Sequence, residues 1–356
     1  MGWDIFRKER VLTIKMRNLT RGNKPGLLAL LAVLGAVALA PPAEAVSMNG
    51  DLIQGQVMTY TVQKKESLYD IARKFDMGAI EIQAANPGVN PWKPKAGTKV
   101  IVTTKHVVPS ITHDGILINL SASRLFYFPG GGEVMTFPVA SGKEGWETPV
   151  AATTVIEKKK NPTWTPPARI RAENPDLPEF IPPGPDNPLG QYAMALGLSG
   201  IMIHGTTSPT SIGKHASHGC IRMYPEDIKT LFNAVPRGTP VLITKTPYVI
   251  GWQGDTLYLQ VTPKVHTVSK KTQKPPPADK MLHQAVSHEA GDGTTVYWNV
   301  VDDVMARGDG IPTVIGTRQS WGPRLPEPVV GSLPQSQRAS LTIITDEDSF
   351  HRPVAD

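Results

Sequence analysis

The sequence predicts a mainly β protein with short helices, in which a large β-rich domain follows a small strand-helix-helix-strand module. Short apolar or alternating runs separated by turn residues dominate residues 106–262, a pattern typical of strands. Residues 58–104 instead place two helix-length segments between two strand-like runs. A hydrophobic content of 40% over 356 residues is sufficient for the cores of two or three domains.

The first 45 residues have the organisation of a secretory signal peptide. Seven Lys and Arg residues flank the start of an apolar stretch over residues 26–40, and Ala43-Glu44-Ala45 forms an A-x-A cleavage pattern. We therefore expect cleavage after Ala45, with Met16 as an alternative start. The competing interpretation is a membrane anchor, although the apolar stretch is shorter than the roughly 20 residues that span a bilayer.

The net charge depends largely on that same segment. The chain carries 37 Lys and Arg residues against 31 Asp and Glu, and without residues 1–45 these counts become 30 and 28. A chain so close to neutrality gives no indication of a nucleic-acid partner. Export together with a single cysteine suits an oxidising compartment such as the bacterial periplasm.

The module at residues 58–104 has clear helix signals. Ser67 is a good N-cap, and one apolar helix face follows it, made by Leu68, Ile71, Ala72 and Phe75. Asn86-Pro87-Gly88 then ends the second helix. The module resembles a LysM domain in four motifs: Tyr60-Thr61-Val62, Ser67-Leu68-Tyr69-Asp70-Ile71-Ala72, Asn86-Pro87-Gly88-Val89-Asn90-Pro91 and Gly97-Thr98-Lys99-Val100.

The resemblance implies that this module binds the N-acetylglucosamine chains of peptidoglycan or chitin. One departure concerns the loop that normally faces the glycan, where the usual Gly-Asp before the Ser/Thr is Lys65-Glu66. A spacer with the LysM fold and little glycan binding is therefore the alternative, because a fold does not fix a function.

The β-rich domain is expected to contain six strands, at residues 116–120, 125–128, 134–140, 153–156, 202–204 and 241–244. Nine prolines fall within residues 162–188, which excludes regular helix and most strand pairing. We expect a long, stiff loop that borders a site, with Trp164, Phe180 and Tyr192 as a substrate wall. A passive connection is the alternative.

Two further helices are expected after this loop. Pro225 opens the first, over residues 225–232, with acidic residues in its first turn. Beyond residue 263 a Lys- and Pro-rich linker precedes an amphipathic helix built on Val296, Val300, Val301 and Val304, ending near Gly308. Residues 263–356 form a C-terminal extension with no functional assignment.

The candidate chemistry lies around Cys220, the only cysteine. A solitary thiol forms no internal disulfide but retains its nucleophilicity. The alternative is that Cys220 is a small, buried apolar residue. His204 ends an apolar strand and suits the role of general base. The carbonyl of Gly205 can accept the second ring N–H of His204, and the amides of Gly219 and Cys220 are candidate oxyanion donors.

Neighbouring side chains have competing interpretations. His204, His215, His218 and Cys220 are all metal-ligand types, but structural zinc sites prefer paired ligands and several cysteines, so we expect no metal. His215 is expected to be a hydrogen-bonded loop residue. Arg222 is either a solvated charge or a bidentate partner for a substrate carboxylate.

These motifs are similar to those of the YkuD family of L,D-transpeptidase catalytic domains. Counted together with the signal segment and the LysM-like module, the similarity covers residues 26–262. The motifs are His204-Gly205-Thr206, Ser211-Ile212-Gly213, Ser217-His218-Gly219-Cys220-Ile221-Arg222 and Pro225-Glu226-Asp227-Ile228. Residues 181–190 are typical of the Gram-negative periplasmic branch of that family.

The resemblance implies a YkuD-like β-sandwich with short helices, at residues 106–262, and a cysteine acyltransferase without metal or organic cofactor. Cys220 would attack the bond between meso-diaminopimelate and D-alanine in a peptidoglycan tetrapeptide stem, with His204 as base and Gly205 orienting it. Substrate-binding residues would be Arg222, Ser217, His218 and Thr206. Carbapenems would acylate Cys220.

The thioester would pass to an amine of a second diaminopimelate, giving a 3-3 crosslink, or of an outer-membrane lipoprotein. Transfer to water would give a carboxypeptidase or hydrolase. A non-catalytic peptidoglycan-binding protein and a cell-wall cysteine peptidase are rivals. In the common wall peptidases the cysteine precedes the histidine, whereas His204 precedes Cys220 here.

Overall fold

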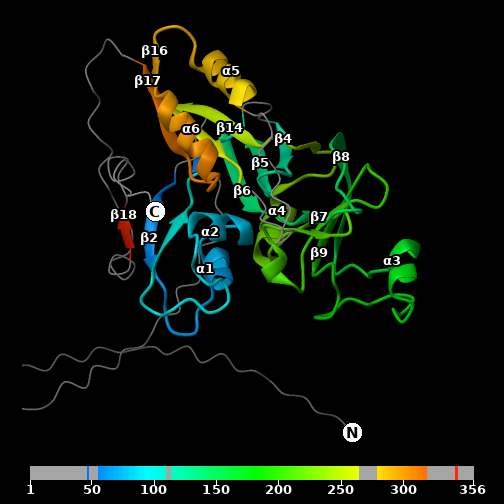
Figure 1. The fold of residues 1–356 in the computed structure, drawn as a ribbon. Helices are drawn as coiled ribbons and strands as arrows, with labels where there is room; N and C mark the ends of the chain where they lie inside the picture. Colours follow the sequence, from blue (N-terminus) through cyan, green and yellow to red (C-terminus); the bar gives the residue numbers. More distant parts are fainter. Residues whose placement is uncertain (1–45, 48–54, 110–113, 264–278, 319–340, 344–356) are drawn as a thin grey trace, which may run out of the picture. The chain divides into compact units, whose positions relative to one another are not determined.

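A computed structural model describes residues 46–47, 55–109, 114–263, 279–318 and 341–343 (Figure 1). The expected signal peptide and its cleavage site lie outside these residues. In the described part of the chain, no helix is both long and apolar enough to cross a membrane.

The predicted strand-helix-helix-strand module is confirmed. Its elements are β2 (Val57–Thr61), α1 (Leu68–Lys74), α2 (Ala79–Ala85) and β3 (Lys99–Thr103). The strands β2 and β3 pair antiparallel, and β18 (Leu341–Ile343) pairs with the other edge of β2. One apolar core joins both strands to both helices.

Local side-chain hydrogen bonds explain where these helices begin and end. Ser67 caps α1, since its Oγ accepts the Asp70 N–H at 3.1 Å while Asp70 accepts the Ser67 N–H at 2.8 Å. The buried side chain of Asn86 ends α2, because its amide bonds the carbonyl of Ile82 and both backbone groups of Ile101. These bonds also fix α2 to β3.

The following domain is built on a nine-stranded mixed sheet. Its strand order is β1-β6-β5-β4-β13-β8-β9-β10-β12. The strands are β1 (Val46–Ser47), β4 (Gly115–Asn119), β5 (Arg124–Gly130), β6 (Glu133–Pro138), β8 (Ala151–Lys160), β9 (Tyr192–Leu196), β10 (Met202–His204), β12 (Ile221–Arg222) and β13 (Pro240–Thr244). The six predicted strands all fall on members of this sheet.

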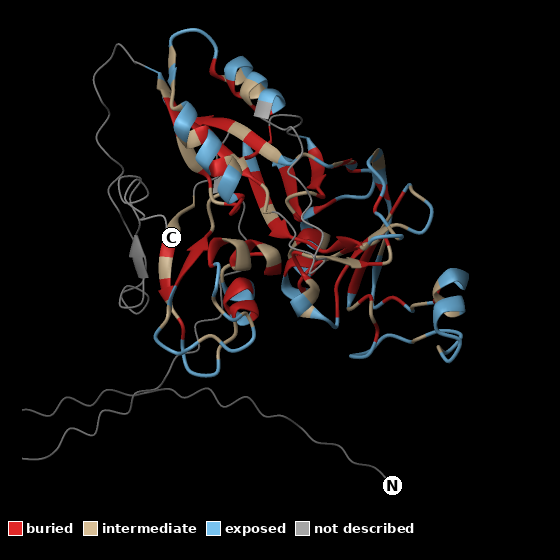
Figure 2. Cartoon of the chain, in the orientation of Figure 1, coloured by how far each residue is buried: buried red, intermediate tan, exposed pale blue. Residues whose placement is uncertain are grey.

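The predicted sandwich is made by the two halves of this single sheet, which face one apolar core. Ile116 and Ile118 of β4 share that core with Met194 of β9 and Ile203 of β10. The helix α4 (Pro225–Ala234), predicted at residues 225–232, adds Ile228 and Leu231 to the same core. Figure 2 shows the strands as the most buried part of the chain.

A second sheet follows, with order β14-β15-β17-β16. It comprises β14 (Tyr248–Gln253), β15 (Thr256–Val261), β16 (Thr294–Val296) and β17 (Thr313–Arg318), with α5 (Asp279–Ala290) and α6 (Trp298–Arg307) sharing its core. The predicted amphipathic helix is α6, and it ends at Gly308 in the left-handed conformation.

This pairing differs from the domain boundary expected at residue 262. Residues 248–261, assigned by the sequence to the catalytic domain, instead pair with β17 of the C-terminal extension. The physical reason is that β14 and β15 bury Trp252, Leu257 and Leu259 against the helices of the extension rather than against the large sheet. Strand pairing therefore separates the two sheets between Thr244 and Tyr248.

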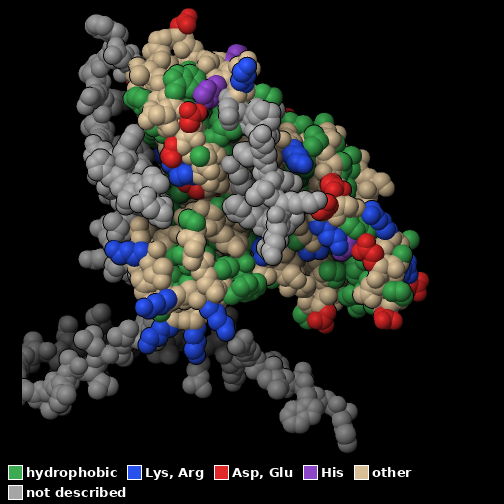
Figure 3. All heavy atoms as spheres, in the orientation of Figure 1, with side chains coloured by type: hydrophobic (Ala, Val, Ile, Leu, Met, Phe, Trp, Pro, Cys, Tyr) green, Lys and Arg blue, Asp and Glu red, His purple; other side chains and the backbone are tan. Residues whose placement is uncertain are grey.

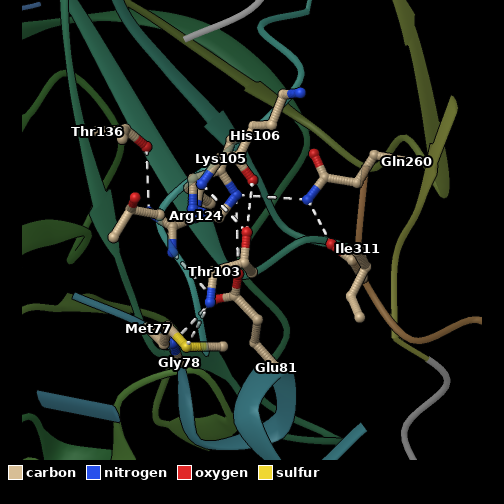
Figure 4. Close-up of polar contacts among 12 residues, drawn as sticks. Met77, Gly78, Glu81, Thr103, Lys105, His106, Arg124, Thr136, Gln260 and Ile311 are labelled. Atoms are coloured by element: carbon tan, nitrogen blue, oxygen red, sulfur yellow. Dashed lines mark hydrogen bonds and ion pairs between the residues drawn. The ribbon is translucent and has the colours of Figure 1, made fainter. Parts of the chain in front are cut away.

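A buried ion pair joins the first module to the large sheet. Arg124 of β5 places its guanidinium 2.9 Å from Glu81 of α2, and both side chains are nearly inaccessible to solvent. His106 lies 3.7 Å from the other Glu81 oxygen, and Figure 4 shows the three side chains converging. Burial and the Arg124 charge hold the pKa of His106 well below its usual range, so the ring is neutral and Arg124 is the cation that balances Glu81.

Glu81→Gln should lower the free energy of unfolding by about 3 kcal/mol, because it removes the carboxylate that hydrogen-bonds the buried Arg124 guanidinium. Glu226→Gln is the matched control, since Glu226 pairs with Arg73 at a half-exposed position where about 1 kcal/mol or less is at stake. Urea denaturation of the two variants measures both values. Equal losses would contradict the importance given to the buried pair.

Candidate active site

The candidate site lies where β10 and β12 run parallel at the edge of the large sheet. Ile203 pairs with Ile221 and His204 pairs with Arg222. Cys220 immediately precedes β12, two residues before Arg222. Residues paired across parallel strands share a sheet face, so the register places His204 and Arg222 toward the same side of the sheet. The Arg222 charge acts on the pKa values of both His204 and Cys220, so both groups lie near its guanidinium.

His204 has a fixed tautomer. Its Nδ1 lies 2.6 Å from the Gly205 carbonyl oxygen, which is the contact that the sequence predicted. A carbonyl oxygen only accepts, so Nδ1 carries the proton and the lone pair is on Nε2. Burial lowers the pKa of His204 to about 4, and the Arg222 charge acts in the same direction. The ring is therefore neutral at neutral pH and can accept a proton.

Cys220 is partly buried and carries a neutral thiol. Its Sγ donates to the carbonyl of Gly200 at 3.3 Å. Burial raises the pKa of the Cys220 thiol, and a backbone contact with Met202 and the Arg222 charge only partly oppose this shift. A neutral thiol and a neutral imidazole near the same guanidinium suit proton transfer during attack rather than a permanent ion pair.

The turn before Cys220 is held by side-chain hydrogen bonds. Ser217 Oγ donates to the Cys220 carbonyl at 2.5 Å and accepts the Gly219 N–H at 3.1 Å. Thr148 donates to the Gly219 carbonyl at 2.7 Å. Gly219 adopts φ +103°, and a Cβ there would lie 3.2 Å from Ile201, so the turn requires glycine.

This arrangement bears on the oxyanion donors expected from the sequence. The Gly219 N–H is already donated to Ser217, so in this conformation it does not point freely at a substrate. Ser217 itself stabilises the turn through two backbone contacts. Thr206 is buried, and its Oγ1 accepts the Ser208 N–H at 2.9 Å, which shapes the loop after His204.

Arg222 is held in place by hydrogen bonds of its backbone, and its guanidinium remains available to bind a ligand. Its N–H and carbonyl each bond the backbone of Ala140 at 2.9 Å. The guanidinium has no hydrogen bond or ion pair with any residue that the structure describes, and its charge shifts the pKa values of both His204 and Cys220. An unpaired, partly buried guanidinium beside these groups suits the recognition of a carboxylate.

The proline-rich segment reaches the site through a short helix, α3 (Ala168–Glu173), so the prediction that its prolines exclude regular helix was wrong. The helix fits because it begins directly after Pro167, at its N-cap, and ends before Pro175. Glu173 lies 3.4 Å from His218 Nε2 and accepts the Trp146 indole N–H at 3.0 Å. Arg169 stacks on the Trp146 ring at 3.7 Å, and that ring meets His218 edge-on. The segment therefore borders the nucleophile turn, as predicted, and His218 lines this border.

The expected aromatic wall is only partly present. Tyr192 is buried on β9 against Phe232 and belongs to the core, so its assignment to a substrate wall was wrong. Its position in an alternating strand, rather than in the loop before it, is the physical reason. Trp164 pairs with Ile181 across the segment, and Phe180 is 54% exposed.

No sequence pattern pointed to Trp146, Thr148 or Glu173. Trp146 and Thr148 lie in the segment before β8 and Glu173 ends α3, and only the tertiary fold brings them to the Cys220 motif. His215 is hydrogen-bonded to Ser141 at 2.7 Å, as expected, but it lies on the strand β11 (His215–Ser217), which pairs with β7 (Ser141–Gly142), rather than in a loop. Among the described residues, no three His, Cys, Asp or Glu side chains form a group that could hold a metal.

Similar proteins agree with this geometry. Residues 113–243 match the family described as "YkuD: L,D-transpeptidase catalytic domain", and residues 60–103 match the LysM domain. The chain is 34% identical over 307 residues to "Probable L,D-transpeptidase YcfS" of Escherichia coli (strain K12), an alignment covering 82% of this chain and 95% of that relative. The chain belongs to the L,D-transpeptidase family.

Two further Escherichia coli (strain K12) relatives are similar. "Probable L,D-transpeptidase YbiS" is 34% identical over 297 residues, covering 80% of this chain and 95% of that relative. "Probable L,D-transpeptidase ErfK/SrfK" is 38% identical over 207 residues, covering 56% and 66%. The L,D-transpeptidase is thus an acyltransferase acting on peptidoglycan, and its LysM and catalytic domains indicate peptidoglycan binding.

The alkylation rate of Cys220 by iodoacetamide should rise continuously with pH, without a plateau between about pH 5 and 8, because the free enzyme holds a neutral thiol. Cys220 is the only cysteine, so the label reports on one site. Glutathione labelled in parallel is the control for intrinsic thiol reactivity. A rate that is constant through acidic pH would indicate a thiolate-imidazolium pair and contradict this expectation.

Proposed function

We propose that Cys220 is the nucleophile and His204 the general base of an acyl transfer on the tetrapeptide stem of peptidoglycan. The observation that carries this proposal is the Nδ1 contact of His204 with the Gly205 carbonyl, which leaves Nε2 as the proton acceptor. Arg222 pairs with His204 and lies two residues after Cys220, and its charge acts on both groups. The family assignment supplies the substrate class.

In the first half-reaction, Cys220 Sγ attacks the carbonyl at the L-centre of meso-diaminopimelate, and the thiol proton passes to His204 Nε2. The C–N bond to the terminal D-alanine breaks, and the leaving amine takes that proton. The product is a thioester on Cys220. Burial keeps His204 neutral before attack, so the base begins in its accepting form.

In the second half-reaction, an acceptor amine attacks the thioester carbonyl and gives its proton to His204. The C–S bond breaks and the proton returns to sulfur, which regenerates the thiol. The acceptor is a second diaminopimelate, giving a 3-3 crosslink, or a lysine of an outer-membrane lipoprotein. Water in the same position would make the enzyme a carboxypeptidase or hydrolase.

The Cys220 N–H would donate a hydrogen bond to the oxyanion formed in each half-reaction. The Gly219 N–H would donate a second one once it no longer bonds Ser217. Arg222 binds a carboxylate of the stem peptide, because its guanidinium has no ion-pair partner in the described chain and its charge acts on both reacting residues. His218, Ser217 and Thr206 line or shape this site.

The LysM domain would hold the glycan chain near the catalytic domain. Four exposed lysines lie in its loops, Lys64, Lys65, Lys93 and Lys95, and Figure 3 shows Lys and Arg side chains gathered on this module. Positive charge suits a wall polymer whose stems carry carboxylates. The proposed location is the periplasm, reached through the signal peptide at residues 1–45.

Cys220→Ser and His204→Ala should abolish or strongly reduce product formation from tetrapeptide muropeptides. We expect losses of about 10³-fold for the nucleophile and about 10²-fold or more for the base. His288→Ala, an exposed position on α5, is the matched control. Mass spectrometry identifies the products: dimers support transpeptidation, while loss of D-alanine alone would favour the hydrolase and overturn the amine acceptor. Unchanged turnover in Cys220→Ser would overturn the nucleophile.

Arg222→Lys should raise the KM for the tetrapeptide donor by about 10-fold or more, since a lysine cannot make the bidentate contact. Its kcat should change less than its KM. Arg237→Lys, an exposed position, provides the comparison. Steady-state kinetics on a donor and on the same donor amidated at its terminal carboxylate test the assignment. An equal KM effect on both donors would show that Arg222 does not bind that carboxylate.

A further inference from the structure

The LysM domain contacts the loop that connects His204 to Cys220. The loop spans residues 205–219, and the turn between α1 and α2 meets it at Ile212 and Gly213. The Ala79 N–H donates to the Ile212 carbonyl at 2.8 Å. A Cβ built on Gly78 would lie 2.9 Å from Gly213 Cα, so the two backbones touch with no side chain between them.

The same loop is held on its opposite side by the segment after β6. The Gly213 N–H donates to the Val139 carbonyl at 3.0 Å, and the next residue, Ala140, makes both backbone bonds to Arg222. Hydrogen-bonded backbone therefore runs from Ala79 through the loop to Arg222. Gly213 adopts φ +82°, a conformation that favours glycine and fits this close approach.

Other contacts surround this junction. Arg73 of α1 makes two hydrogen bonds, of 2.6 and 2.7 Å, to Glu226 in the first turn of α4. The Tyr224 hydroxyl donates to the Met77 carbonyl at 3.3 Å, and Lys214 Nζ lies 4.4 Å from the centre of the Tyr69 ring. These residues of the catalytic domain lie within six positions of Cys220 along the chain.

The buried Arg124–Glu81 pair strengthens the same junction. Arg124 also donates to the carbonyl of Asp76, the residue that enters the turn, at 3.0 Å. Glu81 in turn accepts the N–H of Gly78 at 3.0 Å. The conformation of residues 76–79 is thus fixed by the ion pair, and the turn presents a rigid backbone to the loop.

We propose that the α1–α2 turn of the LysM domain, residues 76–79, is a positioning element of the transpeptidase site: it holds the loop 205–219 and thereby the geometry of Cys220 and Arg222. This inference rests on the proposed role of Cys220 as nucleophile. Misplacement of reacting groups by about 1 Å is sufficient to lower turnover by about 10²-fold. The LysM domain would thus serve catalysis as well as wall binding.

Gly78→Ala tests this proposal in the full-length protein. Gly78 has φ −81° and ψ 155°, which alanine adopts without strain, so the added methyl group acts only on Gly213. We expect hydrogen exchange in residues 205–219 to increase, the Cys220 alkylation rate to change at least 3-fold, and kcat to fall about 10-fold with a smaller change in KM. Amide exchange within β2, β3, α1 and residues 80–85 of α2 should stay as in the wild type, whereas the Ala79 N–H, which bonds the loop, should exchange faster.

Unchanged loop exchange and unchanged Cys220 labelling in Gly78→Ala would overturn the proposal. Hydrogen exchange and Cys220 alkylation are measured without catalytic turnover, so they test the positioning role even if the wild type forms no dimers. Absence of dimers would overturn the proposed function alone.

Exchanging the charges of Arg73 and Glu226 provides a second test, which can be made even if Gly78→Ala does not fold. Arg73→Glu and Glu226→Arg should each increase loop exchange and lower kcat several-fold, because each places like charges together. The double variant restores the pair and should recover most of both losses. Arg237→Glu controls for charge reversal at an exposed site. Single variants without effect on the loop, or a double variant without recovery, would overturn the proposal.

Discussion

The parallel pairing of β10 with β12 is the constraint on which the site depends. It sets His204 opposite Arg222 and leaves Cys220 directly before β12. A parallel pair needs a long connection, and residues 205–219 supply it as the loop that carries the nucleophile turn. The site is therefore a consequence of sheet register, supported by the core contacts of Ile203 and Ile221.

Burial then determines the protonation states within this register. It lowers the pKa of His204 to about 4 and raises that of Cys220, so both groups begin neutral. In the proposed mechanism, the proton moves only when a substrate carbonyl approaches the sulfur. The nearby Arg222 charge favours the neutral imidazole and opposes the rise in the pKa of the thiol, so the proposed carboxylate recognition would be linked to the reactivity of Cys220.

The connecting loop is also where the LysM domain meets the catalytic domain. The ion pair between Arg124 and Glu81 lies in a buried environment, where an unpaired charge is costly, so it holds the two domains in one arrangement. The contact of Gly78 with Gly213 then transmits that arrangement to the loop. Wall attachment and acyl transfer thus share one set of contacts.

The LysM domain, the six strands of the large sheet and the helices α4 and α6 follow from the sequence alone, because capping, alternation and apolar periodicity are local patterns. Motif spacing also predicts His204 and Cys220 as the reacting pair, and this stays a prediction. The burial of Tyr192, the pairing of β15 with β17, the Gly219–Ser217 hydrogen bond and the contacts of His218 with Glu173 and Trp146 come from the tertiary structure alone. Each of these depends on contacts between segments far apart in the chain, which local propensity does not encode.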